Sequence, residues 1–319
     1  MSRLIECVPN FSEGRRPAVV DAIASAVSAV TGAHLLDRTS DIDHNRSVLT
    51  FAGHEPAVAD AMERAVAAAI ARIDMHAHQG RHPRLGAVDV IPFVPLGDST
   101  LEDCVGLAQR FGQHIADHFD LPVYLYAAAA MRPERRVLAD IRRPQFEGLA
   151  AMMAAPGGEP DFGPPTPHPT AGAVVVGARP FLVAWNIELS TPDVAIAKRI
   201  AGAIRERDGG LPRVQALGLL LDDLGVAQVS MNLLDTSVTP MWRVWEEVHR
   251  LAREGGVTLR GSELIGLAPQ AAILAAADHA GADPGLPLEE RLTAGAAAVG
   301  IRDFTPDMAL ELRLARAAG

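Results

Sequence analysis

The sequence predicts an α+β protein made of two ferredoxin-like subdomains in tandem, each with the element order β-α-β-β-α-β. Its length of 319 residues suits two domains of ordinary size. Short β-branched runs alternate with longer Ala-, Leu- and Val-rich segments, and this succession occurs twice along the chain. We expect subdomains at residues 1–178 and 179–319, with a ligand cleft or tunnel between their two sheets.

The first half supplies the first succession of elements. A short strand ends at Pro9, and a turn leads into an Ala/Val-rich helix that begins near Pro17. The polar stretch 39–45 is expected to be a loop. In chain order, the expected elements are a strand at 4–8, a helix at 17–30, strands at 34–37 and 46–52, a helix at 55–73 and a strand at 88–94.

The middle of the chain contains a helix at 101–119, a strand at 123–126 and a short helix at 146–155. Residues 156–172 (PGGEPDFGPPTPHPTAG), here called the proline-rich segment, favour irregular structure. The prolines make the segment stiff, and an ordered loop of this length within a compact protein is often functional. A plain linker is the alternative.

The second half repeats the order of the first. CVPNFSEGRRPAVVDAI and VAWNIELSTPDVAIAKRI both run from a strand through Asn and a Ser-containing turn into a helix, which indicates an internal duplication. The expected elements are a strand at 181–189, a helix at 192–205, strands at 214–221 and 226–233, a helix at 240–252, a strand at 257–260 and a helical tail from residue 286 onward.

The stretch before the strand at 88–94 is crowded with titratable groups, and we call residues 75–87 the histidine loop. Pro83 biases His82 towards an extended conformation, so we expect His82 to lie outside a helix. An imidazole held beside guanidinium groups suits proton transfer on an anionic substrate. A surface histidine and a metal site with His-x-His spacing are the alternatives, although no HExxH motif or cysteine pair completes a ligand set. The charged and titratable residues of the loop are His76, His78, Arg81, His82 and Arg84.

Composition excludes some classes of function. The net charge of −10 and the pI of about 5.5 argue against a nucleic-acid surface, which needs clustered positive charge. An anionic ligand would therefore need a local positive pocket, which the histidine loop offers. Cys7 and Cys104 show no metal or redox spacing, so we expect reduced, packed thiols. The absence of a signal peptide and of any apolar run of about 18 residues predicts a cytoplasmic protein.

Several motifs follow one another in the order of a known family. They are CVPNFSEG at 7–14, NR at 45–46, HPRLGAVDVIPFVP at 82–95, PVYLY at 122–126, DFGPP at 161–165, GAR at 177–179 and AQVSMNLLD at 227–235. On these residues, which are spread over almost the whole length, the chain resembles the glutamate formimidoyltransferases, also called formiminotransferases. In vertebrates these are fused to a cyclodeaminase. The resemblance implies two subdomains with folate bound in a positively charged tunnel between them.

The resemblance also implies an activity. This is transfer of the formimino group from N-formimino-L-glutamate to tetrahydrofolate, giving 5-formiminotetrahydrofolate and L-glutamate in histidine degradation and one-carbon metabolism. His82 is then the catalytic group, tetrahydrofolate is a co-substrate, and no metal is needed. The implied folate-binding segment consists of Gly163, Pro164, Pro165, Thr166, Pro167, His168, Pro169, Thr170, Ala171 and Gly172.

Further residues have the chemistry to bind these substrates. Both substrates carry carboxylates, which the planar fork of arginine binds in two places, and amide side chains suit the polar edges of a pterin or an amidine. Structural ion pairs, solvated charges and turn formation are the alternatives. The candidates are Asn10, Asn45, Arg46, Arg81 and Arg84, with Arg179 as a weaker one.

The sequence departs from the family pattern near the catalytic histidine, where Thr39 replaces an aspartate. Asp41 or Asp43 could substitute, so the carboxylate that orients His82 is left open. Asp89, at the start of a buried strand, is a further candidate, although capping the strand is the plainer account.

The sequence also leads to expectations about partners and leaves alternative functions open. No cyclodeaminase segment follows Gly319, so we expect a separate cyclodeaminase to act next, and we expect a homodimer because members of the family commonly pair. Three rivals stay open. They are formyl transfer between 5-formyltetrahydrofolate and glutamate, a non-catalytic folate-binding protein, and a metal-dependent hydrolase built on His76, His78 and His82. The presence of His82 argues against the second.

Overall fold

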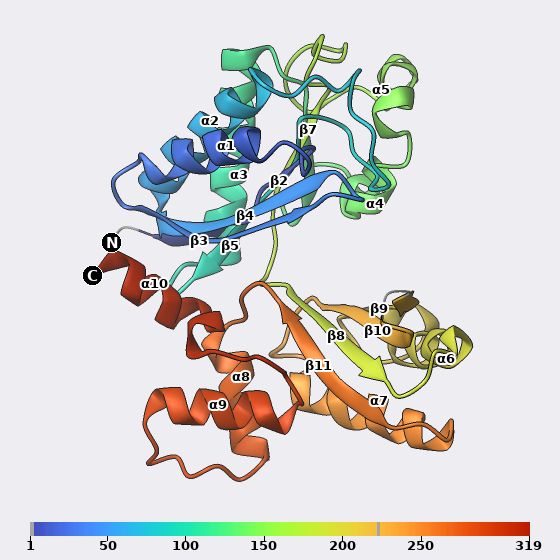
Figure 1. Cartoon of the computed structure of the whole chain (residues 1–319). Coiled ribbons are helices and arrows are strands. Elements are labelled where there is room, and N and C mark those ends of the chain that lie inside the picture. Colours follow the sequence, from blue (N-terminus) through green and yellow to red (C-terminus); the bar gives the residue numbers. More distant parts are fainter. Residues whose placement is uncertain (1–2, 222–223) are drawn as a thin grey trace. The chain divides into compact units, whose positions relative to one another are not determined.

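The computed structural model describes residues 3–221 and 224–319. The chain divides into two compact units, the first ending at Pro180 and the second beginning at Phe181. Each unit contains a sheet with helices packed against it (Figure 1). The predicted α+β class is therefore confirmed.

The first unit contains a mixed sheet. Its strands are β1 (Leu4–Cys7), β2 (Asn10–Phe11), β3 (Ala33–Asp41), β4 (Arg46–His54), β5 (Val88–Leu96), β6 (Val123–Ala127) and β7 (Val174–Ala178). Its helices are α1 (Pro17–Ser28), α2 (Glu55–Ile70), α3 (Leu101–Phe119), the 3₁₀ turn η1 (Pro133–Arg135), α4 (Leu138–Ile141) and α5 (Gln145–Ala154).

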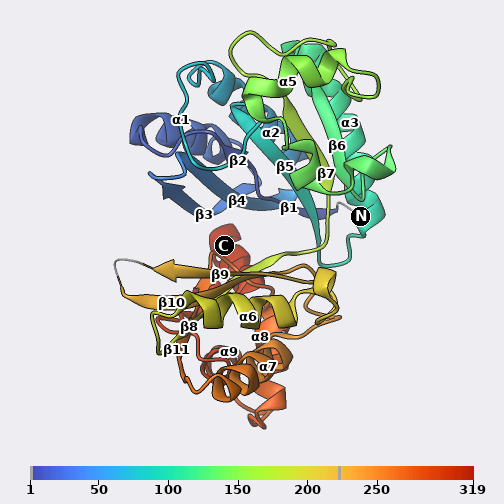
Figure 2. The ribbon, with the colours of Figure 1, turned by 90° about the vertical axis from the view of Figure 1, so that its right-hand side faces the viewer.

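The sheet of the first unit is antiparallel on one side and parallel on the other (Figure 2). Strands β1 and β2 flank Pro9, which has no N–H for the ladder, and both pair antiparallel with β4 and β5. Strand β3 pairs with the far edge of β4. Strand β7 pairs in parallel with β5 and β6, which brings the end of the proline-rich segment beside the histidine loop.

Two parts of this sheet differ from the prediction. Strand β7 lies where the sequence predicts no strand, because residues 174–176 form a short valine run that is fully buried between β5 and β6. Strand β3 continues to Asp41, into the stretch predicted to be a loop, because residues 39–41 pair with residues 46–48 of β4. Tertiary pairing outweighs the polar character of residues 39–41.

Side chains of this sheet alternate between two apolar layers, as strand geometry requires. On one face, Ile91 and Phe93 of β5 join the cluster formed with α1, α2 and α3. On the other face, Val90 joins a cluster that contains Tyr124 and Leu149 and that includes residues of α4 and α5. The second layer holds α5 over the side of the sheet from which the histidine loop emerges.

The second unit contains an antiparallel sheet of order β11-β8-β10-β9. Its strands are β8 (Val183–Leu189), β9 (Val214–Leu221), β10 (Val226–Leu233) and β11 (Leu259–Ile265). Its helices are α6 (Val194–Ile204), the 3₁₀ turns η2 (Glu206–Asp208) and η3 (Pro306–Met308), α7 (Met241–Glu254), α8 (Gln270–His279), α9 (Leu288–Ala298) and α10 (Leu310–Ala318).

Both units begin with the order β-α-β-β-α-β. In the second unit the first strand, β8, lies between the fourth, β11, and the third, β10, with the second, β9, at the edge. In the first unit the interrupted strand β1/β2 likewise lies between β5 and β4, with β3 at the edge. The helical tail predicted from residue 286 is present, but α8 precedes it in a stretch with no predicted element, where Ile273 packs into the core beside Leu292.

No helix in the described part of the chain has both the length and the apolar character that a membrane span requires.

Gly86 joins the histidine loop to the proline-rich segment, and this contact predicts a large effect of substitution. A Cβ at Gly86 would lie 2.2 Å from the carbonyl oxygen of Ala173 and 2.3 Å from that of Ala171. We expect Gly86→Ala to lower the free energy of unfolding by about 2 kcal/mol or more, because both carbonyls belong to packed backbone. Chemical denaturation measures this change.

The matched control is Gly106→Ala in α3. There the nearest atom to an added Cβ is the mobile end of Arg110, and helix propensity predicts a gain of roughly 0.5–1 kcal/mol. Equal stability of Gly86→Ala and the wild type would contradict the tight contact.

Candidate active site

The histidine loop connects α2 to β5 and forms neither helix nor strand, so His82 lies outside a helix, as predicted. Backbone hydrogen bonds tie both ends of the loop to the proline-rich segment. The N–H of Met75 donates to the carbonyl of Thr170 (2.8 Å), and the N–H of Ala87 donates to that of Ala171 (2.9 Å). Two segments that lie far apart in the sequence therefore form one structure.

The proline-rich segment is irregular, as predicted, and one histidine orders its last turn. The backbone N–H groups of Thr170 and Ala171 donate to Nδ1 of His168, at 3.3 and 3.0 Å. Because Nδ1 accepts, the neutral ring carries its proton on Nε2. Burial lowers the pKa of His168 and so favours this neutral form.

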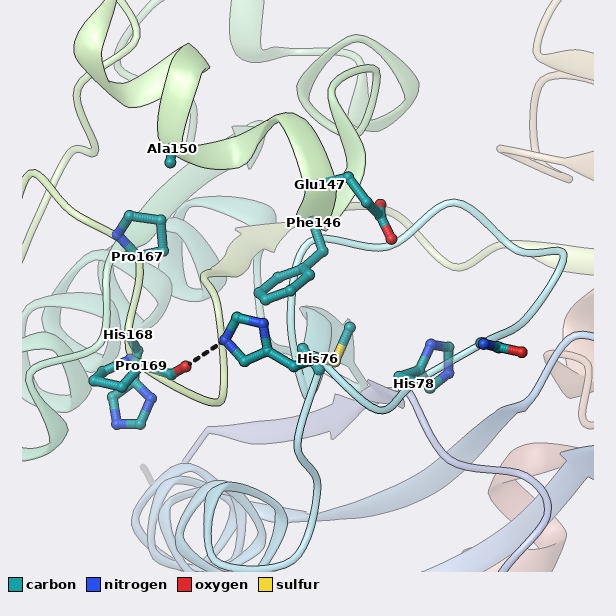
Figure 3. A pocket seen from close by; sticks show the side chains of 10 residues that line it. His76, His78, Phe146, Glu147, Ala150, Pro167, His168 and Pro169 are labelled. Carbon is teal, nitrogen blue, oxygen red and sulfur yellow. Dashed lines mark hydrogen bonds between the residues drawn. The ribbon is translucent and has the colours of Figure 1, made fainter.

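A cavity of about 700 Å³, here called the large cavity, lies between the histidine loop, α5 and the proline-rich segment (Figure 3). His76 closes it at one point, where Nε2 lies 2.9 Å from the carbonyl oxygen of Pro169 and the ring meets Phe146 edge-on at 5.1 Å between centroids. Flat apolar walls and a few polar groups suit a planar organic ligand. The lining residues are Met75, His76, His78, Gln79, Phe146, Glu147, Ala150, Pro167, His168 and Pro169.

Arg84 holds the histidine loop against α5. Its guanidinium is nearly buried and donates to both carboxylate oxygens of Glu147, at 2.7 and 2.9 Å. Its Nε donates to Nδ1 of His78 (3.1 Å), and Nε2 of His78 in turn lies 2.9 Å from the carbonyl oxygen of Asn45. Arg84 is therefore engaged within the protein, which matches the ion-pair alternative for this residue.

The two candidate asparagines also make internal contacts. Asn45 has a left-handed backbone (φ 49°), accepts from the N–H of Gly14 (2.9 Å) and donates to the carbonyl of Gln79 (2.9 Å). Buried Asn10 donates to the carbonyl of Val8 (3.0 Å), whereas its Oδ1 has no hydrogen-bond partner among the described residues. Asn45 thus orders the loops, and Asn10 retains one buried acceptor.

His82 lies at a second, narrow cavity, here called the small cavity, which meets the large cavity at His78. Burial and the charges of Arg46 and Arg142 lower the pKa of His82 to about 3. Its imidazole is therefore neutral at neutral pH and available as a proton acceptor. The lining residues of the small cavity are Phe11, Ser12, His44, Asn45, Arg46, His78, His82, Arg84 and Asp89.

Arg46 makes no direct ion pair, although the carboxylates of Asp89 and Asp41 lie near enough to act on its charge. No ion pair or side-chain hydrogen bond joins it to another described residue, and its Nε is buried without a partner there. Burial and the neighbouring charge of Arg142 lower the pKa of Arg46 to about 10. Desolvating an unpaired charge is unfavourable, so this guanidinium is suited to bind an anion.

Arg142 is a site residue that the sequence analysis does not single out. It forms an ion pair with Asp89, and both side chains are almost completely buried. The stretch that contains Arg142 is recognisably rich in arginine, but only the packing of α4 and α5 on the sheet brings this side chain to His82 and Arg46. Exposed Arg81 and half-buried Arg179, at the end of β7, form no ion pair with a described residue.

Two of the carboxylates considered as partners of His82, Asp89 and Asp41, are occupied elsewhere. Asp89 accepts from the N–H of Leu85 (2.9 Å) and pairs with Arg142. Asp41 pairs with His44, at 2.7 Å between Oδ2 and Nδ1. Within residues 3–221 and 224–319, no carboxylate is hydrogen-bonded to His82. The electrostatic partners of His82 are arginines, and this arrangement is suited to proton transfer on a small anion.

The three histidines of the loop do not converge on one point. His76 contacts Pro169 and His78 contacts Asn45 and Arg84, and the described residues contain no group of three or more His, Cys, Asp or Glu side chains placed to hold a metal ion.

The sequence matches two family profiles: the formiminotransferase domain, N-terminal subdomain, over residues 4–179, and the formiminotransferase domain over residues 184–290. It is 42% identical to the glutamate formimidoyltransferase of Streptococcus pyogenes serotype M1, over 88% of this chain and 93% of that protein. It is 45% identical to the glutamate formimidoyltransferase of Thermoplasma acidophilum, over 86% of this chain and 91% of that protein. The chain therefore belongs to the formiminotransferase family.

A longer relative matches as well. The formimidoyltransferase-cyclodeaminase of Mus musculus is 44% identical, over 87% of this chain and 52% of its own length. Among solved structures, a microcompartment protein from Desulfitobacterium hafniense covers 83% of this chain at 11% identity, but a TM-score of 0.23 supports no inference about the fold.

The low pKa of His82 predicts a pH dependence of stability. The unfolded chain binds a proton at this histidine below about pH 6.5, whereas the folded protein binds it only near pH 3. The contribution of His82 to the free energy of unfolding is therefore present above about pH 6.5 and is lost as the pH falls towards 3. We expect His82→Gln to flatten the dependence of stability on pH in this window, measured by denaturation at a series of pH values.

Arg46→Met serves as the companion variant. It removes one charge that lowers the pKa of His82, so it should flatten the same dependence in part. Identical slopes for the wild type and His82→Gln would show that His82 is not held neutral by its surroundings.

Proposed function

We propose that this protein transfers the formimino group from N-formimino-L-glutamate to tetrahydrofolate, giving 5-formiminotetrahydrofolate and L-glutamate. The observation that carries the proposal is the identity of 42–45% to two glutamate formimidoyltransferases over almost their whole length. It is supported by the position of His82, the residue that the family resemblance implies as catalytic, beside Arg46 and Arg142. The protein is accordingly a transferase of one-carbon groups.

The two units correspond to the two subdomains of the family, with residues 1–178 as the N-terminal and 179–319 as the C-terminal subdomain. Each is classed as ferredoxin-like, because the first strand of each lies between the fourth and the third and pairs antiparallel with both. The folate tunnel stays a prediction from the sequence.

Residues 163–172 bind the folate. Support comes from the large cavity, whose walls include Pro167, His168 and Pro169 of this segment and the ring of Phe146. A volume of about 700 Å³ falls within the range of sites for small organic ligands. The flat side chains suit a pterin or an aminobenzoyl ring, and the contacts of the segment with polar groups come largely from its backbone.

In the chemical step, N5 of tetrahydrofolate attacks the amidine carbon of the donor. The bond between that carbon and the glutamate nitrogen then breaks. N5 loses a proton and the glutamate nitrogen gains one, so no net proton is consumed. Neutral His82 accepts the N5 proton. General base catalysis of this kind contributes roughly 10²–10⁴-fold, whereas alignment of the two substrates offsets about 7–11 kcal/mol of the barrier, so positioning carries more of the rate.

Carboxylates of the substrates bind to the unpaired guanidinium of Arg46, with exposed Arg81 as a second contact. An anion there would offset the two charges that keep His82 from accepting a proton, so donor binding would also make His82 a better base. The buried Oδ1 of Asn10 accepts a hydrogen bond from an N–H group of a substrate. Asn45 and Arg84 act on the substrates indirectly, by holding the loops that bind them.

Formyl transfer in place of formimino transfer is not favoured, because the similar proteins are named for the formimino reaction. Tetrahydrofolate is a co-substrate that the reaction consumes. The homodimer, the cytoplasmic location and the separate cyclodeaminase stay predictions from the sequence.

The first test is a folate-product assay with formiminoglutamate and tetrahydrofolate, run on the wild type and on His82→Ala. We expect 5-formiminotetrahydrofolate from the wild type and turnover at least about a hundredfold slower from the variant, because the proton acceptor is lost. Binding of 5-formyltetrahydrofolate should persist in the variant, since His82 does not line the large cavity. Folate binding by the wild type without any transfer would favour the binding-protein alternative.

The variant Arg46→Met tests whether Arg46 binds the substrate or only stabilises the fold. Loss of the guanidinium should raise KM for formiminoglutamate by about tenfold or more, the loss expected when a hydrogen bond to a charged group is removed. The same variant should not lower the free energy of unfolding, because it replaces a half-buried charge that makes no direct ion pair with an apolar side chain. Arg143→Met, at an exposed neighbour of Arg142, is the control. A variant that loses stability and keeps its KM would exclude the anion-binding role.

A further inference from the structure

His44 lies in the turn between β3 and β4 and is held in one orientation by Asp41. Its backbone N–H donates to Oδ1 of Asp41 (2.8 Å), and its Nδ1 lies 2.7 Å from Oδ2. Burial alone would raise the pKa of Asp41, but the hydrogen bonds from His44 lower it overall. The ionised carboxylate therefore accepts from Nδ1–H, and Nε2 is the nitrogen left to exchange a proton with other groups.

The ring of His44 meets the ring of His82 edge-on. Their centroids are 6.3 Å apart and their planes form an angle of 71°. Both rings line the small cavity, so the two histidines face the same narrow space. Apart from Asp41, which contacts His44 from β3, and Asp43 in the same turn, the charged and titratable groups that share the small cavity with His44 are Arg46, His78, His82, Arg84 and Asp89.

We propose that His44, oriented by Asp41, is a second proton-transfer group of the reaction, and that it protonates the departing glutamate nitrogen while His82 accepts the proton of N5. The inference rests on the proposed formimino transfer. It assigns one proton movement to each histidine.

The surroundings of the two histidines divide these tasks. Burial and the charges of Arg46 and Arg142 leave His82 without a proton at rest, so it enters the reaction as an acceptor. His44 instead faces the carboxylate of Asp41, which fixes the orientation of its ring. Two titratable groups in opposite surroundings are the arrangement that general acid and base catalysis requires.

The cycle balances. The bond between N5 and the amidine carbon forms, and His82 takes the N5 proton. The bond between that carbon and the glutamate nitrogen breaks, and His44 supplies a proton to the nitrogen. His82 then releases its proton and half-exposed His44 takes one up from solvent, which restores both groups for the next turnover.

The test compares kcat as a function of pH for the wild type, His44→Gln and Asp41→Asn. Gln keeps a donor for Asp41 but cannot transfer a proton, so we expect His44→Gln to lower kcat by about 10²-fold and to remove the alkaline limb of the profile. Asp41→Asn should reduce kcat to a smaller extent. The control is His114→Gln, at a surface histidine whose Nε2 lies 3.0 Å from Glu63 with similar exposure, and it should leave kcat unchanged.

Three outcomes distinguish a proton-transfer role of His44 from a structural one. If the wild type forms no 5-formiminotetrahydrofolate, the proposed function fails before any variant is compared. If the wild type is active and His44→Gln keeps its rate, or loses rate while both limbs of the profile remain, His44 is at most structural and the inference is wrong. The reverse reaction gives an independent check, because His44 then acts as the base and the limb that His44→Gln loses must lie on the acid side.

Discussion

The structure of the candidate site depends on a short stretch of backbone pairing between the histidine loop and the proline-rich segment. The N–H of Ala87 donates to Ala171, the N–H of Ala173 donates to Leu85, and Gly86 lies opposite Gly172. The pairing continues into the parallel strands β5 and β7. Because of it, a titratable loop and a segment about 90 residues later form the two walls of the large cavity.

A second constraint is electrostatic. The protein has a net charge of −10, yet it holds Arg46 half-buried with no direct ion pair to a described residue and places Arg142 close by. Such an arrangement lowers stability, and a fold under no functional demand would replace it with apolar side chains. Burial and the same two charges keep His82 neutral, so this arrangement accounts for both an anion site and a proton acceptor. The pair of Asp41 and His44 places a second imidazole near His82.

Much of the fold could be predicted from the sequence, because the spacing of hydrophobic residues and the positions of proline and glycine are local properties. The helix expected at 101–119 and the strands expected at 214–221 and 226–233 coincide with α3, β9 and β10. The sequence did not predict strand β7 or helix α8. The valine-rich run of β7 is only five residues long, and neither it nor the alanine-rich stretch of α8 has a distinctive spacing of hydrophobic residues. Their structure is decided by the strands and helices that cover them.

The sequence by itself determined the class of fold, the repeated order of elements, the irregular loop that carries His82 and the family to which the chain belongs. The fold class and the order of elements follow from the spacing of hydrophobic residues, and the irregular loop follows from its proline and glycine residues. The family follows from motifs that occur in a known order. Only the tertiary structure decided that Arg84 is engaged with Glu147, that Arg46 is unpaired, that Arg142 lies beside His82 and that Asp41 orients His44 instead of His82. The type of a residue shows what chemistry its side chain can perform. Its partners depend on contacts that form only when segments distant in the sequence pack together.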